Sequence, residues 1–310
     1  MILAGDIGGT KSHFGLFDGD ALVADARFEN AAFTDFAAVI AALVASPLLA
    51  HLRIDRACLA VAGPVGDDGR SAHLTNLPWS IDGAAIGAAL GGVEVRVAND
   101  FAAAALGAIS SPADSLVSLQ AGEPLADAPR LVVGAGTGLG MAIVLREGTR
   151  WRVVPGEGGH VAFAPTDDEQ DALLHFLRRR GRRVTWERVV AGPGLAAMHT
   201  FFSGHHEDPE PEWVGTQGLA DPTSVAGRAL RLFVQLYGAY AGDMALTCLP
   251  RGGVFLAGGI AAKILPALTD GRFCAAFNHK PPHEALIVRM PVHVATDPVL
   301  ALRGAALLAR

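Results

Sequence analysis

Residues 3–20 read LAGDIGGTKSHFGLFDGD, and residues 131–149 read LVVGAGTGLGMAIVLREGT. Each stretch contains an apolar run, a turn of Gly and Thr, and a second run that ends at Gly19 or Gly148. This pattern predicts a β-hairpin with a tight turn, present twice in one chain. Glycines in such a turn permit positive φ and leave backbone N–H groups open to an anion such as phosphate. An ordinary hairpin is the alternative for either turn alone, but two copies favour a nucleotide held from both sides.

The size and composition of the chain are those of a globular protein. It has 310 residues, of which 51% are hydrophobic and 18% are charged. This length is sufficient for two α/β domains with separate cores. The net charge of −6 argues against nucleic acid or an anionic membrane as a partner, because both favour a basic surface.

The three cysteines, Cys58, Cys248 and Cys274, lie far apart and have no CxxC spacing. They predict a reducing cytoplasm and exclude a disulfide framework and a zinc site. The N-terminus begins directly with a predicted strand, so no signal peptide is expected. The most apolar run, residues 36–50, is shorter than the roughly 20 residues of a membrane-spanning helix. We expect a buried helix there that starts behind Asp35.

Predicted strands and helices alternate along the chain, which is typical of a largely parallel sheet. Functional residues of such sheets lie at the carboxyl ends of the strands. Asp6, Gly63 and the pair Asn99 and Asp100 fall at such ends.

Two domains are predicted, with connections near residues 110–130 and 296–298. The first domain is residues 1–110, completed by a C-terminal helix over residues 297–310. The second domain is residues 111–296. A chain that returns its last helix to its first domain would have a double hinge.

Asn99 and Asp100 end the predicted strand VEVRVAND. A carboxylate at a strand end can accept a proton from a hydroxyl and so act as a general base. The alternative is that Asp100 only caps the helix that follows.

The sequence PGEGGHVAF, residues 155–163, places Glu157 and His160 on one glycine-rich loop. Two polar side chains there can converge on neighbouring hydroxyls of a sugar-sized ligand. A metal site is one alternative, although two ligands without a third bind a metal ion poorly. An ordinary surface turn is the other alternative. Glu187 in VTWERVVAGPG has a weaker signal, because a helical Glu is normally solvated.

Other glycine pairs could also approach an anion. Gly258 and Gly259 open a predicted helix, whose N-terminus suits an anionic group. The GPG at residues 192–194 could act likewise or could end a helix. The P-loop motif is excluded because no Gly-Lys dipeptide occurs, and the glycines of GAGTGLG break the GxGxxG spacing.

Taken together, these motifs resemble the bacterial glucokinases of the actin-like, sugar kinase and Hsp70 superfamily. The motifs are GDIGGT, AVAGPV, LTNLPW, ANDF, GAGTGLG, PGEGGHVAFAP, ERVVAGPGL and FLAGGI, in chain order. They run over nearly the whole chain, and PGEGGHVAFAP with ANDF upstream and ERVVAGPGL downstream is highly specific. The resemblance implies an α/β, two-domain actin-like ATPase (ribonuclease H-like) fold with mixed sheets and a central cleft.

The resemblance also implies ATP- and Mg²⁺-dependent phosphorylation of glucose at its 6-hydroxyl. Asp100 would be the catalytic base, and Asp6 would hold Mg²⁺ through water. The residues implied to bind the other sugar hydroxyls are Asn99, Glu157, His160 and Glu187. The residues implied to contact the nucleotide are Asp6, Gly8, Gly9, Thr10, Gly136, Thr137 and Gly138 near the phosphates, with Gly192, Gly258 and Gly259 beside adenosine.

We expect a cytoplasmic homodimer whose partners are glucose and ATP. Three other functions stay open: a kinase for glucosamine, mannose or fructose, a non-catalytic sugar sensor or repressor, and an actin-like ATPase. The phosphoryl donor could also be ADP or polyphosphate. Lys11 departs from the glucokinase pattern, which has Asn there. Lys is typical of the repressor, open-reading-frame and kinase (ROK) family, whose cysteine-rich zinc motif this sequence lacks.

Overall fold

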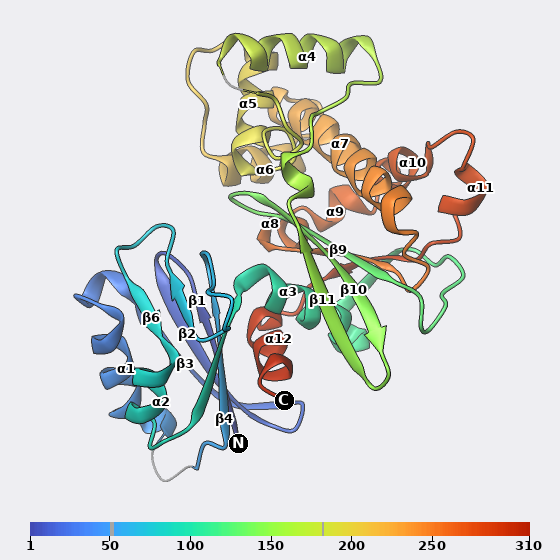
Figure 1. The fold of residues 1–310 in the computed structure, drawn as a ribbon. Helices are drawn as coiled ribbons and strands as arrows, with labels where there is room; N and C mark the ends of the chain where they lie inside the picture. The colour runs from blue at the N-terminus through green and yellow to red at the C-terminus, as the bar shows by residue number, and fades with distance from the viewer. Residues whose placement is uncertain (50–52, 182) are drawn as a thin grey trace. The chain divides into compact units, whose positions relative to one another are not determined.

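The computed structural model describes residues 1–49, 53–181 and 183–310, and Figure 1 shows its fold. The chain divides into two compact units. Unit 1 is formed by Met1–Pro112 and Asp297–Arg310, and unit 2 by Ala113–Thr296. Each unit has a main β-sheet with helices packed on it and hydrophobic clusters of its own.

The main sheet of unit 1 is mixed. Its order is β3-β2-β1-β4-β7, with β1, β4 and β7 parallel and β2 and β3 antiparallel to their neighbours. The strands are β1 (Ile2–Ile7), β2 (Lys11–Asp18), β3 (Ala21–Glu29), β4 (Arg56–Val61) and β7 (Glu94–Asn99). The parallel strands end at one edge of the sheet, and this edge carries Asp6 and Asn99.

Helices pack on both faces of this sheet. They are α1 (Phe36–Val44), α2 (Gly83–Ala89), α3 (Asp100–Ile109) and α12 (Leu300–Leu308). The sequence RACLAV of β4 is a continuous apolar run, as expected for a strand buried on both sides. Leu59 belongs to the hydrophobic cluster with α1 and α2, and Cys58 to the cluster with α3 and α12. Successive residues of one strand therefore support two cores.

The last helix, α12, packs against α3 in unit 1. A Cβ atom on Gly304 would lie 1.7 Å from the carbonyl oxygen of Ala103, and one on Gly107 would lie 1.9 Å from that of Leu300. The two helices therefore touch backbone to backbone. This contact fastens the C-terminal segment to the N-terminal unit.

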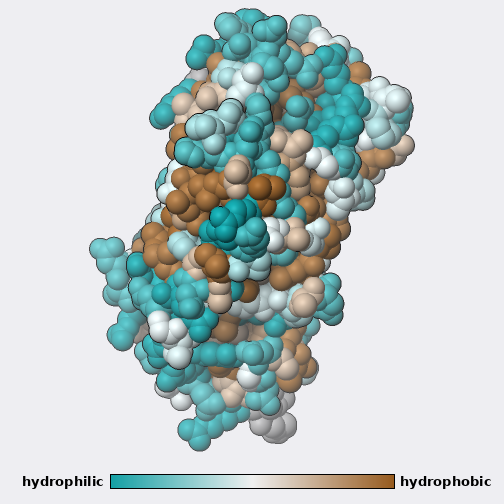
Figure 2. Space-filling view, turned by 90° about the vertical axis from the view of Figure 1, so that its right-hand side faces the viewer, coloured by the Kyte–Doolittle hydropathy of each residue, from teal (hydrophilic) through white to brown (hydrophobic). Residues whose placement is uncertain are grey.

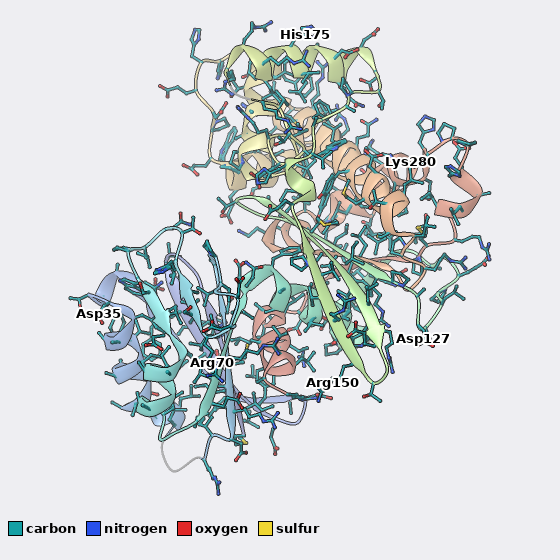
Figure 3. All side chains as sticks on the ribbon, viewed as in Figure 1. Asp35, Arg70, Asp127, Arg150, His175 and Lys280 are labelled. Atoms are coloured by element: carbon teal, nitrogen blue, oxygen red, sulfur yellow. The ribbon has the colours of Figure 1, made fainter. Side chains whose placement is uncertain are left out.

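Helix α1 begins where the sequence predicts but ends earlier. Asp35, labelled in Figure 3, is its N-cap, and Oδ1 of this residue accepts a hydrogen bond of 2.9 Å from the N–H of Ala38. The prediction of a helix over residues 36–50 is wrong beyond Val44, because a separate 3₁₀ turn covers Pro47–Leu49. Proline disfavours helical backbone in the residue before it. Ala50 lies outside the described residues.

The sheet of unit 2 is also mixed. Its order is β11-β10-β9-β12-β13-β8, and β9, β12 and β13 are parallel. The strands are β8 (Leu116–Gln120), β9 (Arg130–Ala135), β10 (Leu139–Glu147), β11 (Arg150–Gly156), β12 (Val254–Ala257) and β13 (Val292–Ala295). Both sheets are thus mixed, as the resemblance implied.

The long helix α7 lies at the centre of the core of unit 2. The helices of this unit are α4 (Asp168–Arg179), α5 (Gly192–Ser203), α6 (Pro211–Ala220), α7 (Val225–Cys248), α8 (Gly259–Lys263), α9 (Leu265–Leu268), α10 (Arg272–Asn278) and α11 (Glu284–Ile287). Tyr237 and Tyr240 of α7 are fully buried. A Cβ atom on Gly238 would lie 2.2 Å from the carbonyl oxygen of Phe273, so α10 approaches α7 at backbone distance.

Several short elements differ from the sequence prediction. A small sheet of β5 (Ser71–His73) and β6 (Ser80–Asp82) was not among the predicted elements. Part of the predicted connection over residues 110–130 is strand β8. The alternative that Gly192 ends a helix is wrong, because α5 begins there.

The surface carries polar and apolar groups side by side. Figure 2 shows one face, where hydrophilic residues predominate toward the top and hydrophobic residues gather in smaller patches. Such a mixture is usual for globular proteins. Among the described helices, none is both long and apolar enough to cross a membrane.

Candidate active site

Both predicted glycine turns are hairpin turns, which confirms the prediction for the two stretches. Strand β1 pairs with β2, and β9 pairs with β10, in antiparallel register. The expectation of positive φ is wrong, since Gly8, Gly9, Gly136 and Gly138 all lack it. The N–H groups of Gly8 and Gly136 close the turns themselves, donating to Lys11 O at 2.9 Å and to Gly138 O at 2.8 Å. Any N–H that meets an anion must therefore come from the other turn residues.

The space around these glycines differs from one to the next. A Cβ atom on Gly138 would lie 2.8 Å from Oε2 of Glu187, and one on Gly9 would lie 3.1 Å from the side chain of Asn76. A Cβ atom on Gly136 would meet nothing within 4 Å. Gly136 therefore faces open space into which a ligand group can enter.

Asn30, a residue that the sequence analysis missed, braces the first glycine turn. Its Nδ2 donates to the carbonyl oxygen of Gly8 and its backbone N–H to that of Thr10, each at 2.8 Å. Its Oδ1 accepts a hydrogen bond of 2.8 Å from the hydroxyl of Ser12. Asn30 is almost fully buried, and the signal in the sequence was an Asn directly after a strand.

Asp6 is a half-buried carboxylate in β1, beside Ala60 of β4. Burial and, second, the charge of Asp100 raise its pKa to about 6, against an opposing effect of His13. The ion pairs found among the described residues include none to Asp6. A cation would relieve both unfavourable effects on the charged carboxylate.

The donor set at Asp6 fits Mg²⁺ better than a metal held by protein alone. The part of the chain that the structure describes contains no group of three His, Cys, Asp or Glu residues able to hold a metal ion. Mg²⁺ usually binds one or two carboxylates and completes its shell with water and substrate phosphates. A single carboxylate beside a glycine turn matches this mode of Mg²⁺ binding.

Asn99, rather than Asp100, caps helix α3. Its Oδ1 accepts hydrogen bonds from the N–H groups of Phe101 at 3.0 Å and Ala102 at 3.2 Å. Asp100 is the first helical residue, and its Oδ1 accepts a bond of 2.8 Å from the Phe101 N–H. Burial raises the pKa of Asp100 despite the lowering effect of its hydrogen bonds. The alternative that Asp100 serves only as the cap is therefore wrong.

In unit 2 the structure brings together Glu157, His160 and Glu187. Glu157 precedes a short 3₁₀ turn, Gly158–His160, that follows β11, and His160 is the last residue of that turn. His160 Nε2 is 3.7 Å from Glu157 Oε2, and His160 Nδ1 is 3.9 Å from Glu187 Oε1. The carboxylates of Glu157 and Glu187 therefore both lie near the His160 ring, while these contacts are too long for good hydrogen bonds.

Glu187 is fixed by the second hairpin, not by a helix as expected. It lies in a turn before α5, and its Oε2 accepts a hydrogen bond of 2.9 Å from the N–H of Leu139 in β10. Its own N–H donates to Gly159 O at 2.8 Å. Glu187 thus joins the glycine turn of β9 and β10 to the Glu157–His160 loop.

Gly192 and Gly258 lie at the carboxyl end of β9, close to Gly136. The N–H of Gly192 donates to the carbonyl oxygen of Gly136 at 2.8 Å. Gly258 has φ +86°, and a Cβ atom on it would lie 2.6 Å from Ala135 O, so only Gly fits. The next residue, Gly259, opens α8 as predicted, and a Cβ atom on it would meet nothing within 4 Å.

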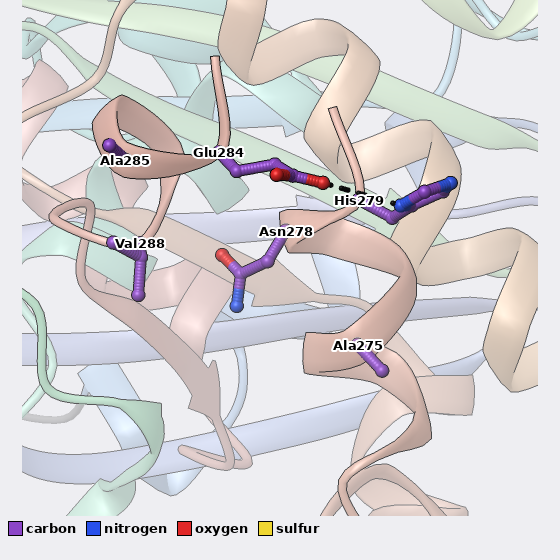
Figure 4. A pocket seen from close by; sticks show the side chains of 6 residues that line it. All are labelled: Ala275, Asn278, His279, Glu284, Ala285 and Val288. Atoms are coloured by element: carbon purple, nitrogen blue, oxygen red, sulfur yellow. Dashed lines mark ion pairs between the residues drawn. The ribbon is translucent and has the colours of Figure 1, made fainter. Parts of the chain in front are cut away.

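Two cavities of unit 2 differ in their relation to these residues. Thr137 and Glu187 line a cavity of about 370 Å³, together with Leu177, Arg180, Arg188, Pro193, Ala197 and Asp208. The cavity in Figure 4, about 410 Å³, lies between α10 and α11 and contains an ion pair of 3.5 Å between His279 and Glu284. Its lining includes none of the predicted site residues, so the first cavity is the one that belongs to the candidate site.

Solved structures define the class of fold. A glucokinase from an Antarctic psychrotroph superposes with a TM-score of 0.88 at 30% identity, covering 99% of this chain and 98% of that chain. A ROK family glucokinase from Streptomyces griseus, solved with glucose and AMPPNP, gives 0.68 at 21% identity, covering 100% and 99%. The fold is therefore that of the sugar kinases with an actin-like ATPase architecture, which confirms the predicted fold class.

Sequence comparisons then define the family. The glucokinase family model matches residues 3–310. A glucokinase from Mesorhizobium japonicum is 39% identical over 316 residues, which cover 100% of this chain and 91% of the relative. The chain belongs to the glucokinase family, and the resemblance found in its motifs is confirmed.

Proposed function

We propose that this chain transfers the γ-phosphoryl group of ATP to the 6-hydroxyl of glucose, giving glucose 6-phosphate. Membership of the glucokinase family supports the reaction class. The observation that carries the proposal is the division of roles at the end of β7. Asn99 caps α3, so the Asp100 carboxylate is available for another task.

Asp100 is the proposed general base. A base works best when its pKa approaches the working pH, and burial raises the pKa of this carboxyl. In the reaction it would accept the proton of the sugar 6-hydroxyl while the oxygen attacks the γ-phosphorus. The bond from the γ-phosphorus to the bridging oxygen breaks, and ADP leaves.

Asp6 is the proposed Mg²⁺ residue, through water. The bound ion would neutralise phosphate charge during transfer, a requirement of phosphoryl transfer in general. Gly8, Gly9 and Thr10 of the same turn are proposed to contact the phosphates from unit 1. Asn30 keeps that turn in shape.

Unit 2 supplies the remaining proposed contacts. The residues proposed to bind sugar hydroxyls are Glu157, His160 and Glu187, together with Asn99 of unit 1. The contacts of His160 with Glu157 and Glu187 are long, so these side chains can form further hydrogen bonds with a sugar. The proposed nucleotide contacts are Gly136, Thr137 and Gly138 for phosphates and Gly192, Gly258 and Gly259 for adenosine. The AMPPNP complex of the Streptomyces griseus relative supports ATP as the donor.

We also propose that units 1 and 2 act as the two domains and that their connections serve as hinges. Residues of both units take part in the proposed reaction, so the units must approach each other on the substrates, which would exclude water. The predicted central cleft remains a prediction. A cytoplasmic homodimer is proposed as well, and three free cysteines support a reducing compartment.

The test is phosphorylation of a hexose panel by ATP and Mg²⁺, with the wild type, Asp100→Ala and Asp67→Ala. Asp67 is an exposed carboxylate of the same unit, which makes it the matched control. We expect glucose-selective turnover that Asp100→Ala lowers by about 10² to 10⁴ while Asp67→Ala leaves it unchanged. Selective turnover of another hexose would show that glucose is not the preferred substrate. Glucose binding without turnover by the wild type would favour a sugar sensor.

A further inference from the structure

The hydroxyl of Tyr240 is a buried polar group without a hydrogen bond. Tyr240 lies on α7 and is fully buried, and its hydroxyl oxygen has no hydrogen-bond partner among the described residues. Tyr237, one turn earlier and equally buried, donates to Val133 O at 3.4 Å and is also bonded by the backbone of Ala135. Burial of an unpaired hydroxyl costs free energy that a phenylalanine would not. Stability alone therefore gives no reason for this hydroxyl.

The unpaired hydroxyl lies beneath the sugar-binding residues proposed above. A Cβ atom on Gly158 would lie 3.1 Å from the Tyr240 hydroxyl oxygen, so the Glu157–His160 loop rests on it. The ring of Tyr240 also packs against Trp186, with centroids 5.7 Å apart. Burial first, and then the Tyr237 hydroxyl and the Glu187 carboxylate, raise the pKa of Tyr240.

The loop and Glu187 form one connected assembly above Tyr240. Gly159 O accepts a bond of 2.8 Å from the Glu187 N–H, and Val161 O accepts one of 3.0 Å from the Trp186 N–H. Within this assembly Oε2 of Glu187 accepts a hydrogen bond from Leu139 N, whereas Oε1 lies 3.9 Å from Nδ1 of His160, too far for a good hydrogen bond. Oε1 can therefore accept another donor.

We propose that Tyr240 is a positioning residue of the sugar site, whose hydroxyl donates a hydrogen bond to the Glu187 carboxylate when a sugar binds. That bond holds Glu187 and the Glu157–His160 loop in the binding position. The inference rests on the proposed function. Since the hydroxyl is unpaired beforehand, the free energy of the new bond adds to sugar affinity and not to the stability of the free protein.

The experiment compares Tyr240→Phe with the matched control Tyr237→Phe. For Tyr240→Phe we expect an unchanged or higher Tm without sugar, a glucose KM raised about tenfold or more, and a nearly unchanged kcat. The Tm increase that glucose produces should shrink in parallel, because it reflects affinity. For Tyr237→Phe we expect a Tm lowered by about 2–4 °C and a normal glucose KM.

Two results overturn the inference while leaving the proposed function intact. One is a Tyr240→Phe variant with a lower Tm and a normal KM, which would assign the hydroxyl to the folded structure alone. The other is a glucose KM that is equal in Tyr240→Phe and Tyr237→Phe, which would show that the effect is not specific to the Tyr240 hydroxyl. If the wild type neither phosphorylates nor binds any hexose, the proposed function itself fails and this inference fails with it.

Discussion

At the residue scale, the glycines of the second turn have different tasks. Gly138 gives room to Glu187, whose Oε2 would lie 2.8 Å from an added Cβ, whereas Gly136 faces open space. Both were predicted from the same motif, GAGTGLG. The motif indicates that another group must approach the backbone closely. Only the structure shows that this group is a protein side chain at Gly138 and that the space at Gly136 is open to a ligand.

This difference predicts that two alanine substitutions affect the KM values of different substrates. Gly136→Ala should leave Tm unchanged and raise the KM for ATP about tenfold, since its methyl group would enter the proposed phosphate site at a cost of about 1–3 kcal/mol. Gly138→Ala should displace the Glu187 carboxylate and raise the KM for glucose instead. Steady-state kinetics with each substrate varied in turn measures both. Equal effects on the two KM values would contradict the assignment.

At the element scale, the start of α3 combines a structural and a functional role. The two oxygen bonds of Asn99 fix the helix N-terminus, and its side-chain amide also donates a hydrogen bond to the Asp100 carboxylate. The amide has two N–H groups, so one stays available for a sugar hydroxyl. Ser is also a good N-cap but has no such amide. The two roles can therefore be separated by substitution.

We expect Asn99→Ser to keep the Tm of the wild type and raise the glucose KM. Asn99→Ala should raise the KM as well but lose the cap, at a cost of about 1 kcal/mol, or roughly 2–4 °C in Tm. Thermal unfolding and glucose kinetics on both variants check this. A Ser variant with a normal glucose KM would remove Asn99 from the sugar site.

The elements that sequence alone predicted are those with local signals. Asp35 marks the start of α1 as predicted and accepts a hydrogen bond from the helix N-terminus. Asp82 and Ser224 cap α2 and α7 in the same way. Strand β8 was missed because its pairing partner, β13, lies far along the chain. The bracing role of Asn30 was missed for the same reason, since it acts on a turn at residues 8–10.

At the scale of the whole molecule, unit 2 should lose stability in mild acid. Burial lowers the pKa of His293, and burial with a smaller effect of His205 lowers that of His199. The unfolded chain takes up these protons near pH 6.5, whereas the folded unit resists them. Their contribution is therefore complete above about pH 6.5 and falls as the pH drops below that value.

Scanning calorimetry at pH 7.5, 6.5 and 5.5 tests this dependence. The wild type should lose Tm between pH 6.5 and 5.5, and a His199→Asn and His293→Asn double variant should lose less. His206→Asn is the control, because that imidazole is exposed. A double variant that loses as much Tm as the wild type over this interval would contradict the prediction.

The central claim is that Asp100 is the base of an ATP-dependent glucose kinase. Its most direct test is the rate of glucose 6-phosphate formation by the wild type and by Asp100→Ala, with glucose affinity measured on the same preparations. The account predicts a kcat lower by about 10² to 10⁴ in the variant, with glucose still bound. A variant that retains the wild-type kcat would contradict it.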